Sequence, residues 1–370
     1  MELDRAKLHA AVKLVEPAIA AKHSVQAFER IAFDGERVQA CDEVVAVSAP
    51  ARTPFKGCVP GAVATKWIAS ARGKTVTVDA SKEDTLALAA GRSKVALPLF
   101  SLKSSPFAFP ALDGALVLKA TNGVLECLAA AARVMDSDAG VVWRMGVTLE
   151  LHKGTARFYS GTDMVLCLAE CKAQYKGAAE QKHVYSLSPR FVQLVLSMGK
   201  SQKLERLHCA EEHTCADFAG GVNVWGSVVG QPDPARFASV VGPVLEGINA
   251  WVPTPAGFQG AMERVLTLAP HYSGDERATA LLEVLPSQRA KDKGMKLLRV
   301  TANCAGYRQV EALSISGKHP DCKAQLVIED IQAVLPAATQ EMHVDDERCA
   351  LVFRCSTDVS RQAYLLSLVS

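Results

Sequence analysis

The feature that most constrains the fold is a layout that occurs three times along the chain. In each copy an amphipathic helix is followed by β-rich segments, a second short helix and further β-rich segments. The second helices begin at Pro60, at Pro189 and near Glu329, which gives a period of roughly 130 to 140 residues. This period predicts three copies of one α+β domain, each with two helices packed on antiparallel sheets, over residues 1–112, 113–243 and 244–370.

The third copy shows the layout most clearly. The pattern predicts a strand over Leu297–Asn303, a turn, a return strand over Gln309–Ser316 and a loop closed by Pro320. An amphipathic helix should follow, because three apolar residues recur at helical spacing: Val327, Ile331 and Val334. If the three copies form an arc, the strands should lie outside and the helices inside.

The other two copies can be aligned with the third. In the first, a helix within Leu3–Ile19 precedes a hairpin whose strands, Phe28–Phe33 and Arg37–Val47, flank an Asp-Gly turn. In the second, a helix near Val124 precedes strands around Lys153 and Gly154. We expect connectors where prolines cluster, at the residues Pro106, Pro110, Pro232 and Pro234.

Composition excludes several classes of protein. A chain of 370 residues with 49% hydrophobic residues can bury two or three cores, and a formal charge of +2 argues against a protein that grips nucleic acid strongly. No apolar run reaches the roughly 18 residues of a membrane helix. The 11 cysteines form no Cys-x-x-Cys pair and follow no apolar leader, so we expect reduced thiols in a soluble cytoplasmic protein with no membrane partner.

Catalytic and metal-binding patterns are weak. The most metal-like segment, His208–Cys215, holds imidazoles and thiols, but its spacing matches no usual zinc pair and the repeat predicts a hairpin there. Gly317 and Lys318 lack the glycine that a phosphate-binding loop requires five residues earlier. We therefore expect no enzyme, no metal and no cofactor. The alternative from a different class is a DNA-acting hydrolase that uses scattered carboxylates on an unrelated α+β scaffold.

Several motifs resemble a known family. They are LLRVTAN, IEDIQAVL and Ala363-Tyr364 in the third copy, GRSKVALPLFSLKSSPFAFPAL in the first, and Thr162-Asp163 with the helix SPRFVQLVLSM in the second. In this order and spacing the chain resembles the bacterial DNA polymerase III beta subunit, the sliding clamp or DNA processivity factor. The divergence of the motifs suggests a phage, plasmid or accessory version.

The resemblance implies a fold and a function. Two chains would join head to tail as a homodimer, closing a six-domain ring around duplex DNA. The ring would tether the replicative polymerase by topology rather than catalysis, would be placed by a clamp loader, and would associate with the nucleoid during replication. A near-neutral charge suits a ring that slides. A closer alternative is a clamp-like decoy that sequesters the polymerase or the loader.

The resemblance places DNA contacts on the helices of the inner wall. Basic residues on or beside the expected helices are the candidates, although solvated helix faces carry such residues in many proteins. We favour Lys22, Lys66, Arg72 and Arg133, and the remaining candidates are Lys7, Lys13, Lys74, Arg190, Lys200 and Arg264. The acidic residues Glu329 and Asp330 indicate that the third copy's second helix stands clear of phosphate.

The resemblance also implies a groove that anchors short partner peptides by apolar side chains. By position it would use Arg144, Thr162, Met164, Val165, Pro234, Val240, Leu365, Ser367 and Leu368. Plain strand core is the alternative for Leu365 and Leu368. The chain departs from the family after Thr162-Asp163 and at its last residues, which predicts either a different partner motif or poor binding of host partners.

The resemblance finally implies a ring interface. An edge strand of the first copy should pair with the first helix of the third, through Arg92, Lys94, Val95 and Leu97 on one side and Thr267, Leu268 and Glu311 on the other. Glu311 is the only acidic residue found opposite the basic pair. Apolar contact and continuation of the sheet should therefore contribute more than ion pairs.

Overall fold

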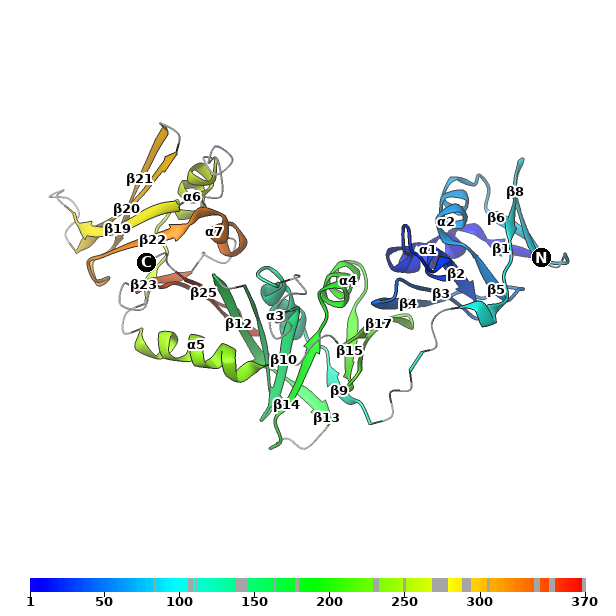
Figure 1. The fold of residues 1–370 in the computed structure, drawn as a ribbon, viewed down its shortest axis with the longest axis horizontal. Coiled ribbons are helices and arrows are strands. Elements are labelled where there is room, and N and C mark those ends of the chain that lie inside the picture. The colour runs from blue at the N-terminus through cyan, green and yellow to red at the C-terminus, as the bar shows by residue number, and fades with distance from the viewer. Residues whose placement is uncertain are drawn as a thin grey trace. The chain divides into compact units, whose positions relative to one another are not determined.

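The computed structural model describes residues 1–82, 84–105, 109–110, 112, 114–136, 145–162, 164–176, 180–228, 233–248, 251–267, 279–287, 294–304, 307–335, 340–345 and 350–367. The chain divides into two compact units (Figure 1). Unit 1 comprises Met1–Thr121, Tyr175–Gly177 and Arg190–Val228, and unit 2 comprises Asn122–Gln174, Ala178–Pro189 and Val229–Ser370.

The described residues of unit 1 form three α-helices. They are α1 (Arg5–Val15), α2 (Gly61–Ser70) and α4 (Pro189–Gly199), with short 3-10 turns at η1 (Glu16–Ala18), η2 (Gln26–Glu29) and η3 (Leu102–Ser104). The Asp4 side chain caps α1 by accepting the Lys7 N–H, and Pro17 occupies the 3-10 turn that ends the helix. The buried face of α1 is Leu8, Ala11, Val12 and Val15, as the apolar spacing predicts.

Two sheets complete unit 1. A four-stranded antiparallel sheet has the order β1-β6-β7-β8, with β1 (Glu2–Asp4), β6 (Thr75–Asp79), β7 (Thr85–Ala90) and β8 (Ser93–Pro98). A nine-stranded sheet has the order β13-β9-β15-β16-β17-β4-β3-β2-β5. Its strands are β2 (Arg30–Phe33), β3 (Arg37–Cys41), β4 (Val45–Pro50), β5 (Gly57–Pro60), β9 (Leu116–Lys119), β13 (Gln174–Lys176), β15 (Leu204–Cys209), β16 (His213–Phe218) and β17 (Val222–Ser227).

The nine-stranded sheet joins the first predicted copy to the second. Strand β17 pairs with β4 in an antiparallel register that sets Val224 opposite Val47. Arg37 on β3 reaches over the same junction and donates to the Ser48 hydroxyl at 2.6 Å and to the Asn223 side-chain oxygen at 2.7 Å. A polar network therefore supports the backbone ladder where the two copies meet.

Unit 2 contains the helices α3 (Asn122–Ala132), α5 (Pro234–Gly247), α6 (Phe258–Leu266) and α7 (Ile328–Val334). A four-stranded sheet, β21-β20-β19-β22, uses β19 (Thr279–Pro286), β20 (Met295–Cys304), β21 (Tyr307–Ser316) and β22 (Cys322–Val327). An eight-stranded sheet has the order β14-β10-β11-β12-β25-β24-β23-β18. Its strands are β10 (Val147–His152), β11 (Thr155–Gly161), β12 (Val165–Lys172), β14 (His183–Leu187), β18 (Val252–Pro253), β23 (Glu341–Asp345), β24 (Ala350–Ser356) and β25 (Ser360–Ser367).

The eight-stranded sheet joins the second predicted copy to the third in the same way. Strand β12 pairs with β25, so that Leu166 lies opposite Leu365 and Glu170 opposite Arg361. Charged side chains of alternating sign cross this sheet in one row, namely Lys182, Glu150, Arg157, Glu170 and Arg361, and neighbours in the row lie 2.8 to 3.9 Å apart. Glu150 is buried, and two cations compensate its charge.

The α+β class with antiparallel sheets is confirmed, and so are the predicted strand pair and helix of the third copy. Two predictions were wrong. The expected single strand Arg37–Val47 is two strands, because Asp42 turns the chain by accepting the N–H groups of Val44 and Val45. The expected connector at Pro234 is helix α5, which Asp233 caps and which Pro234 begins. The boundaries at 112/113 and 243/244 stay predictions.

Gly146 provides a test of the packing in unit 2. Its φ is +82°, and a Cβ placed there would lie 2.1 Å from the Leu187 carbonyl oxygen. We expect Gly146→Ala to lower the free energy of unfolding by about 3 kcal/mol, measured as a lower urea midpoint. Gly260→Ala in α6 is the matched control, since its Cβ would meet only a guanidinium nitrogen of Arg264, at 3.4 Å. The control should be neutral or stabilising by up to about 1 kcal/mol; equal midpoints for the two variants would contradict the packing.

Candidate nucleic-acid and partner-binding surfaces

The candidate DNA-contacting residues lie on or beside helices, except for Lys22, which lies in the loop between η1 and η2. Lys7 and Lys13 lie on α1, Lys66 lies on α2, and Arg72 and Lys74 follow α2. Helices α1 and α2 pack against each other in unit 1. Nine of the ten candidates are exposed, and Arg190 is half-buried.

The unpaired cations form a distinct subset. The subset consists of residues that are exposed and form no ion pair within 4.0 Å with any residue that the structure describes: Lys7, Lys13, Lys22, Lys66, Arg72 and Lys74. Their charges are therefore available to phosphate. Lys200, the residue that follows the last residue of α4, is also exposed. In unit 2, Arg133 is exposed just after α3, and its charge lies near the buried phenol of Tyr364.

Two candidate arginines are engaged within the chain. The Arg190 Nε donates to the Asp42 carboxylate at 3.0 Å, and its guanidinium also donates to the Pro17 carbonyl. Arg264 on α6 makes a two-point contact with Glu311 on β21, at 2.9 and 2.8 Å. The Arg264 hydrogen bond holds the pKa of Glu311 below its usual range. Each pair joins a helix to a turn or strand of the same unit. The carboxylate partly neutralises the charge of each arginine, so that either arginine would attract DNA less strongly.

The predicted docking residues lie around the turn between β11 and β12. The Thr162 hydroxyl accepts the N–H groups of Met164 and Val165, both at 3.2 Å, which holds the turn. Met164 is half-buried and Val165 is buried. Val165 is the first residue of β12 and pairs with Leu366 of β25, so the Thr162 turn lies next to β25. Arg144, Leu368 and the side chain of Ser367 lie outside the described residues.

Helix α5 covers much of the apolar face beside that turn. Phe237 packs on Tyr159 with ring centroids 5.8 Å apart, and Val241, Val244 and Ile248 continue the same helical stripe. This stripe buries Ala350, Val352 and Leu365 of the sheet. Leu365 is therefore strand core beneath α5, whereas Val240 on the outer side of the helix is 48% exposed. Sequence reasoning missed Phe237 and Val241, although their spacing of four was a helical signal.

The predicted interface residues lie at the ends of two sheets. Strand β8, which follows Arg92 and carries Lys94, Val95 and Leu97, is the last strand of its sheet in unit 1. Strand β21, which carries Glu311, is the last strand of its sheet in unit 2. Arg92 and Lys94 are exposed, Val95 is half-buried and Leu97 is buried. Thr267 ends α6, and Leu268 lies outside the described residues.

The metal-like segment is a hairpin, as predicted. Strands β15 and β16 pair with His208 opposite Cys215, and the turn lies at Ala210–Glu212. His208 Nε2 lies 2.7 Å from Asp217, whose pKa the imidazole and Asn223 hold below its usual range despite partial burial. No group of three or more ligand-type side chains able to hold a metal occurs among the described residues.

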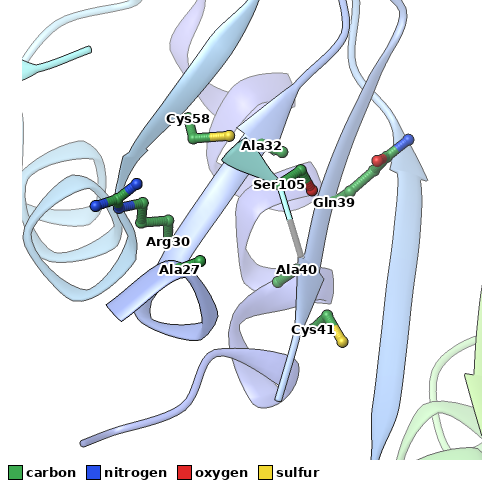
Figure 2. A pocket seen from close by; sticks show the side chains of 8 residues that line it. All are labelled: Ala27, Arg30, Ala32, Gln39, Ala40, Cys41, Cys58 and Ser105. Atoms are coloured by element: carbon green, nitrogen blue, oxygen red, sulfur yellow. The ribbon is translucent and has the colours of Figure 1, made fainter. Parts of the chain in front are cut away.

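Cavities lie among the described residues of unit 1. One, of about 10 Å³, lies beside β2 and β3. It is lined by Ala27, Arg30, Ala32, Gln39, Ala40, Cys41, Cys58 and Ser105 (Figure 2). This volume holds about one water molecule. Burial raises the pKa of Cys41 to about 11, so this thiol is a poor nucleophile. A hollow of about 530 Å³ near Lys7 has walls of mixed charge, including Asp4, Glu36 and Arg52.

No helix among the described residues is long and apolar enough to cross a membrane. No family model matches the sequence, and no curated protein sequence matches it.

Solved structures do match, over the whole chain. The DNA polymerase sliding clamp of Pseudomonas aeruginosa is 16% identical with a TM-score of 0.82, covering 100% of this chain and 99% of that one. The Caulobacter crescentus sliding clamp is 17% identical with a TM-score of 0.80, at the same coverage. The beta subunit from Streptococcus pyogenes DNA polymerase is 12% identical with a TM-score of 0.81, again at that coverage. The chain therefore has the fold of the bacterial sliding clamps from end to end.

Proposed function

We propose that this protein is a sliding clamp, a processivity factor that encircles duplex DNA and tethers a polymerase. The observation that carries the proposal is the full-length match of fold to bacterial clamps, at TM-scores of 0.80 to 0.82. Three domain copies per chain, over 1–112, 113–243 and 244–370, would close a six-domain ring when two chains join head to tail.

The charge distribution supports a loose hold on DNA. The net charge of +2 gives no strong overall attraction, while exposed, unpaired cations gather on and beside α1 and α2. Lysine ammonium groups on flexible stems contact phosphate as point charges, directly or through water. Weak, sequence-independent contacts of this kind let a ring slide. Retention on DNA then comes from topology.

The proposed docking surface is the rim around the β11–β12 turn and the outer side of α5. Met164 and Val240 provide partly exposed apolar surface there, beside the turn that the Thr162 hydroxyl stabilises. A polymerase and a clamp loader are the proposed partners of this rim. Because α5 buries Leu365, the peptide that binds here should be shorter or shallower than one that fills a deep groove.

The proposed activity is not enzymatic. Two alternatives stand beside it: a clamp-like decoy that sequesters a polymerase or a loader, and a DNA-acting hydrolase. No observation on the described surfaces favours the hydrolase. The decoy differs from a clamp only in failing to support synthesis.

Retention on circular DNA tests the clamp directly. Protein assembled around nicked circular plasmid should remain bound through gel filtration and should be lost once the plasmid is linearised. Equal retention on both forms would contradict a topological hold.

The favoured DNA contacts predict a loss of affinity on neutralisation. We expect the combined variant Lys22→Ala, Lys66→Ala, Arg72→Ala and Arg133→Ala to bind duplex DNA more weakly at low salt. The slope of log affinity against log salt should fall by about 0.9 for each phosphate contact removed. Fluorescence anisotropy with a labelled duplex measures both quantities.

A charge-matched control distinguishes contact from net charge. Lys119, Lys172, Lys176 and Lys203 are exposed residues on or next to strands rather than helices. Their combined replacement by alanine removes the same charge and should leave the salt slope unchanged. If both quadruple variants lose affinity equally, the helices are not the DNA-facing surface.

The edge strands predict the oligomeric state. We expect the wild type to be a dimer by light scattering, and Val95→Asp on β8 or Leu268→Asp to give monomers, because a carboxylate at an apolar strand junction is costly to bury. Val359→Asp is the control, since this valine is 43% exposed in the turn between β24 and β25. A dimer that persists in both interface variants would contradict the placement.

The docking rim predicts a position-specific loss of ligand binding. Griselimycin, which is bound to the Pseudomonas aeruginosa clamp in one matching structure, is a defined probe. We expect Val240→Glu to weaken its binding to this chain at least tenfold by calorimetry if the ligand uses the proposed rim, because a carboxylate would replace exposed apolar surface there. The control Val359→Glu lies in the turn between β24 and β25 at a similar exposure of 43%. Equal affinities for the two variants would place the rim elsewhere.

A further inference from the structure

Two thiols of unit 2 lie against each other. Cys127 is on helix α3 and Cys171 is near the end of strand β12, so 43 residues separate them in sequence. Both are free thiols, with Cys127 fully buried and Cys171 6% exposed. Their side chains form a hydrogen bond. A helix and a strand that are distant in sequence thus present one thiol each to the same point.

Gly123 explains how the strand comes so near to the helix. A Cβ placed on Gly123 would lie 3.0 Å from the Cβ of Cys171. Gly123 stands one turn before Cys127, and helical side chains lean toward the N-terminus of their helix. The Cys127 side chain therefore leans toward the notch that Cys171 occupies. A disulfide needs Cβ atoms about 3.5–4.5 Å apart, and Cys171 lies against the helix turn that precedes Cys127.

The two thiols are chemically unequal. The hydrogen bond from Cys127 lowers the pKa of Cys171, against the effects of burial and of Glu170 and Glu126. The same hydrogen bond, with burial, raises the pKa of Cys127. Cys171 also lies beside the first turn of α3, where the helix N-terminus favours negative charge. Cys171 is therefore the more reactive thiol, and Cys127 is the thiol placed to react second.

We propose that Cys127 and Cys171 form a reversible disulfide when the protein meets hydrogen peroxide. The Cys171 thiolate attacks one peroxide oxygen and the O–O bond breaks, so that Cys171 becomes a sulfenic acid while the leaving hydroxide takes up a proton and departs as water. The Cys127 thiol then attacks that sulfur, and the second water leaves as the S–S bond forms. In total two thiols and one peroxide give one disulfide and two waters. A dithiol such as dithiothreitol reverses the reaction by exchange.

The cross-link would act at a junction of unit 2. Glu126, next to Cys127, accepts hydrogen bonds from Thr357 and Ser360 in the turn between β24 and β25, each at 2.9 Å. The backbone of Val359 in the same turn lies against Gly123. The disulfide would thus link β12 to α3, close to Glu126, the residue of α3 that binds the β24–β25 turn. The inference stands on unit 2 alone and does not depend on the proposed function.

The test uses the full chain and peptide mapping. Reduced protein is treated with increasing hydrogen peroxide, quenched by alkylation of the remaining thiols, digested and analysed by mass spectrometry. We expect a linked pair of peptides containing Cys127 and Cys171, about 2 Da lighter than the sum of the reduced peptides, as the first disulfide to form. The melting temperature of the oxidised protein should rise by about 5 °C and return after dithiothreitol.

Single variants separate this pair from general oxidation. Cys127→Ala and Cys171→Ala should each abolish the melting shift, and Cys127→Ala should leave a trappable sulfenic acid on Cys171. Cys209→Ala, at a buried thiol of β15 whose pKa is raised by burial alone, should keep the shift. Should either variant fail to fold, the mapping of wild-type protein still decides. Oxidation that appears first at the more exposed Cys355, with Cys127 and Cys171 still alkylated, would overturn the proposal.

Discussion

The structure depends on strand pairing between copies that are far apart in sequence. Strand β4 pairs with β17 in one sheet, and β12 pairs with β25 in the other. Side chains cross both junctions, but the Arg361–Glu170 pair is 3.9 Å long with Arg361 79% exposed, so it contributes little by itself. The backbone ladder and the apolar pairs on it therefore hold each junction, because a shift of one residue would turn every buried side chain toward solvent. A helix such as α5 can be buried only after β25 has joined β12.

That dependence shapes the proposed docking surface. The face made by β12, β24 and β25 is apolar because it is a junction, and the chain covers most of it with the Phe237, Val241 and Val244 stripe of α5. Among the described residues, Met164 and Val240 on the rim keep part of their apolar surface accessible. A partner that displaced α5 would have to compensate the burial of several apolar side chains, at about 25 cal/mol for each Å² exposed. A partner that binds the rim avoids this cost.

The sequence predicts what is local and periodic. The helix faces at Leu8–Val15 and Val327–Val334 and the hairpin at His208–Cys215 follow from spacing and turn residues within a few positions, and the structure has them. The long repeat predicts the class and suggests the resemblance. The sequence pattern predicts a connector where helix α5 lies, because Pro232 and Pro234 are typical of loops. Proline at the first helical position, after Asp233, is however also a signal for the start of a helix. The partner of a strand edge cannot be predicted from the strand alone, because the residues of β4 do not specify pairing with β17. The sequence around Arg264 likewise does not indicate that Glu311 will form an ion pair with it.

The candidate cations divide by chemistry as well as by position. Arg190 and Arg264, whose planar guanidinium groups suit two-point contacts, are tied to a carboxylate within the chain. Lys7, Lys13, Lys22 and Lys66 are exposed and unpaired among the described residues. Lysine offers a hydrated point charge and binds phosphate without fixed geometry, so moving from one phosphate to the next costs little. Under the proposed function, Arg190 and Arg264 make contacts that persist within the fold, whereas the exposed lysines, together with Arg72 and Arg133, make contacts with DNA that are exchanged. This division accounts for both a stable fold and a mobile hold on DNA at a net charge of only +2.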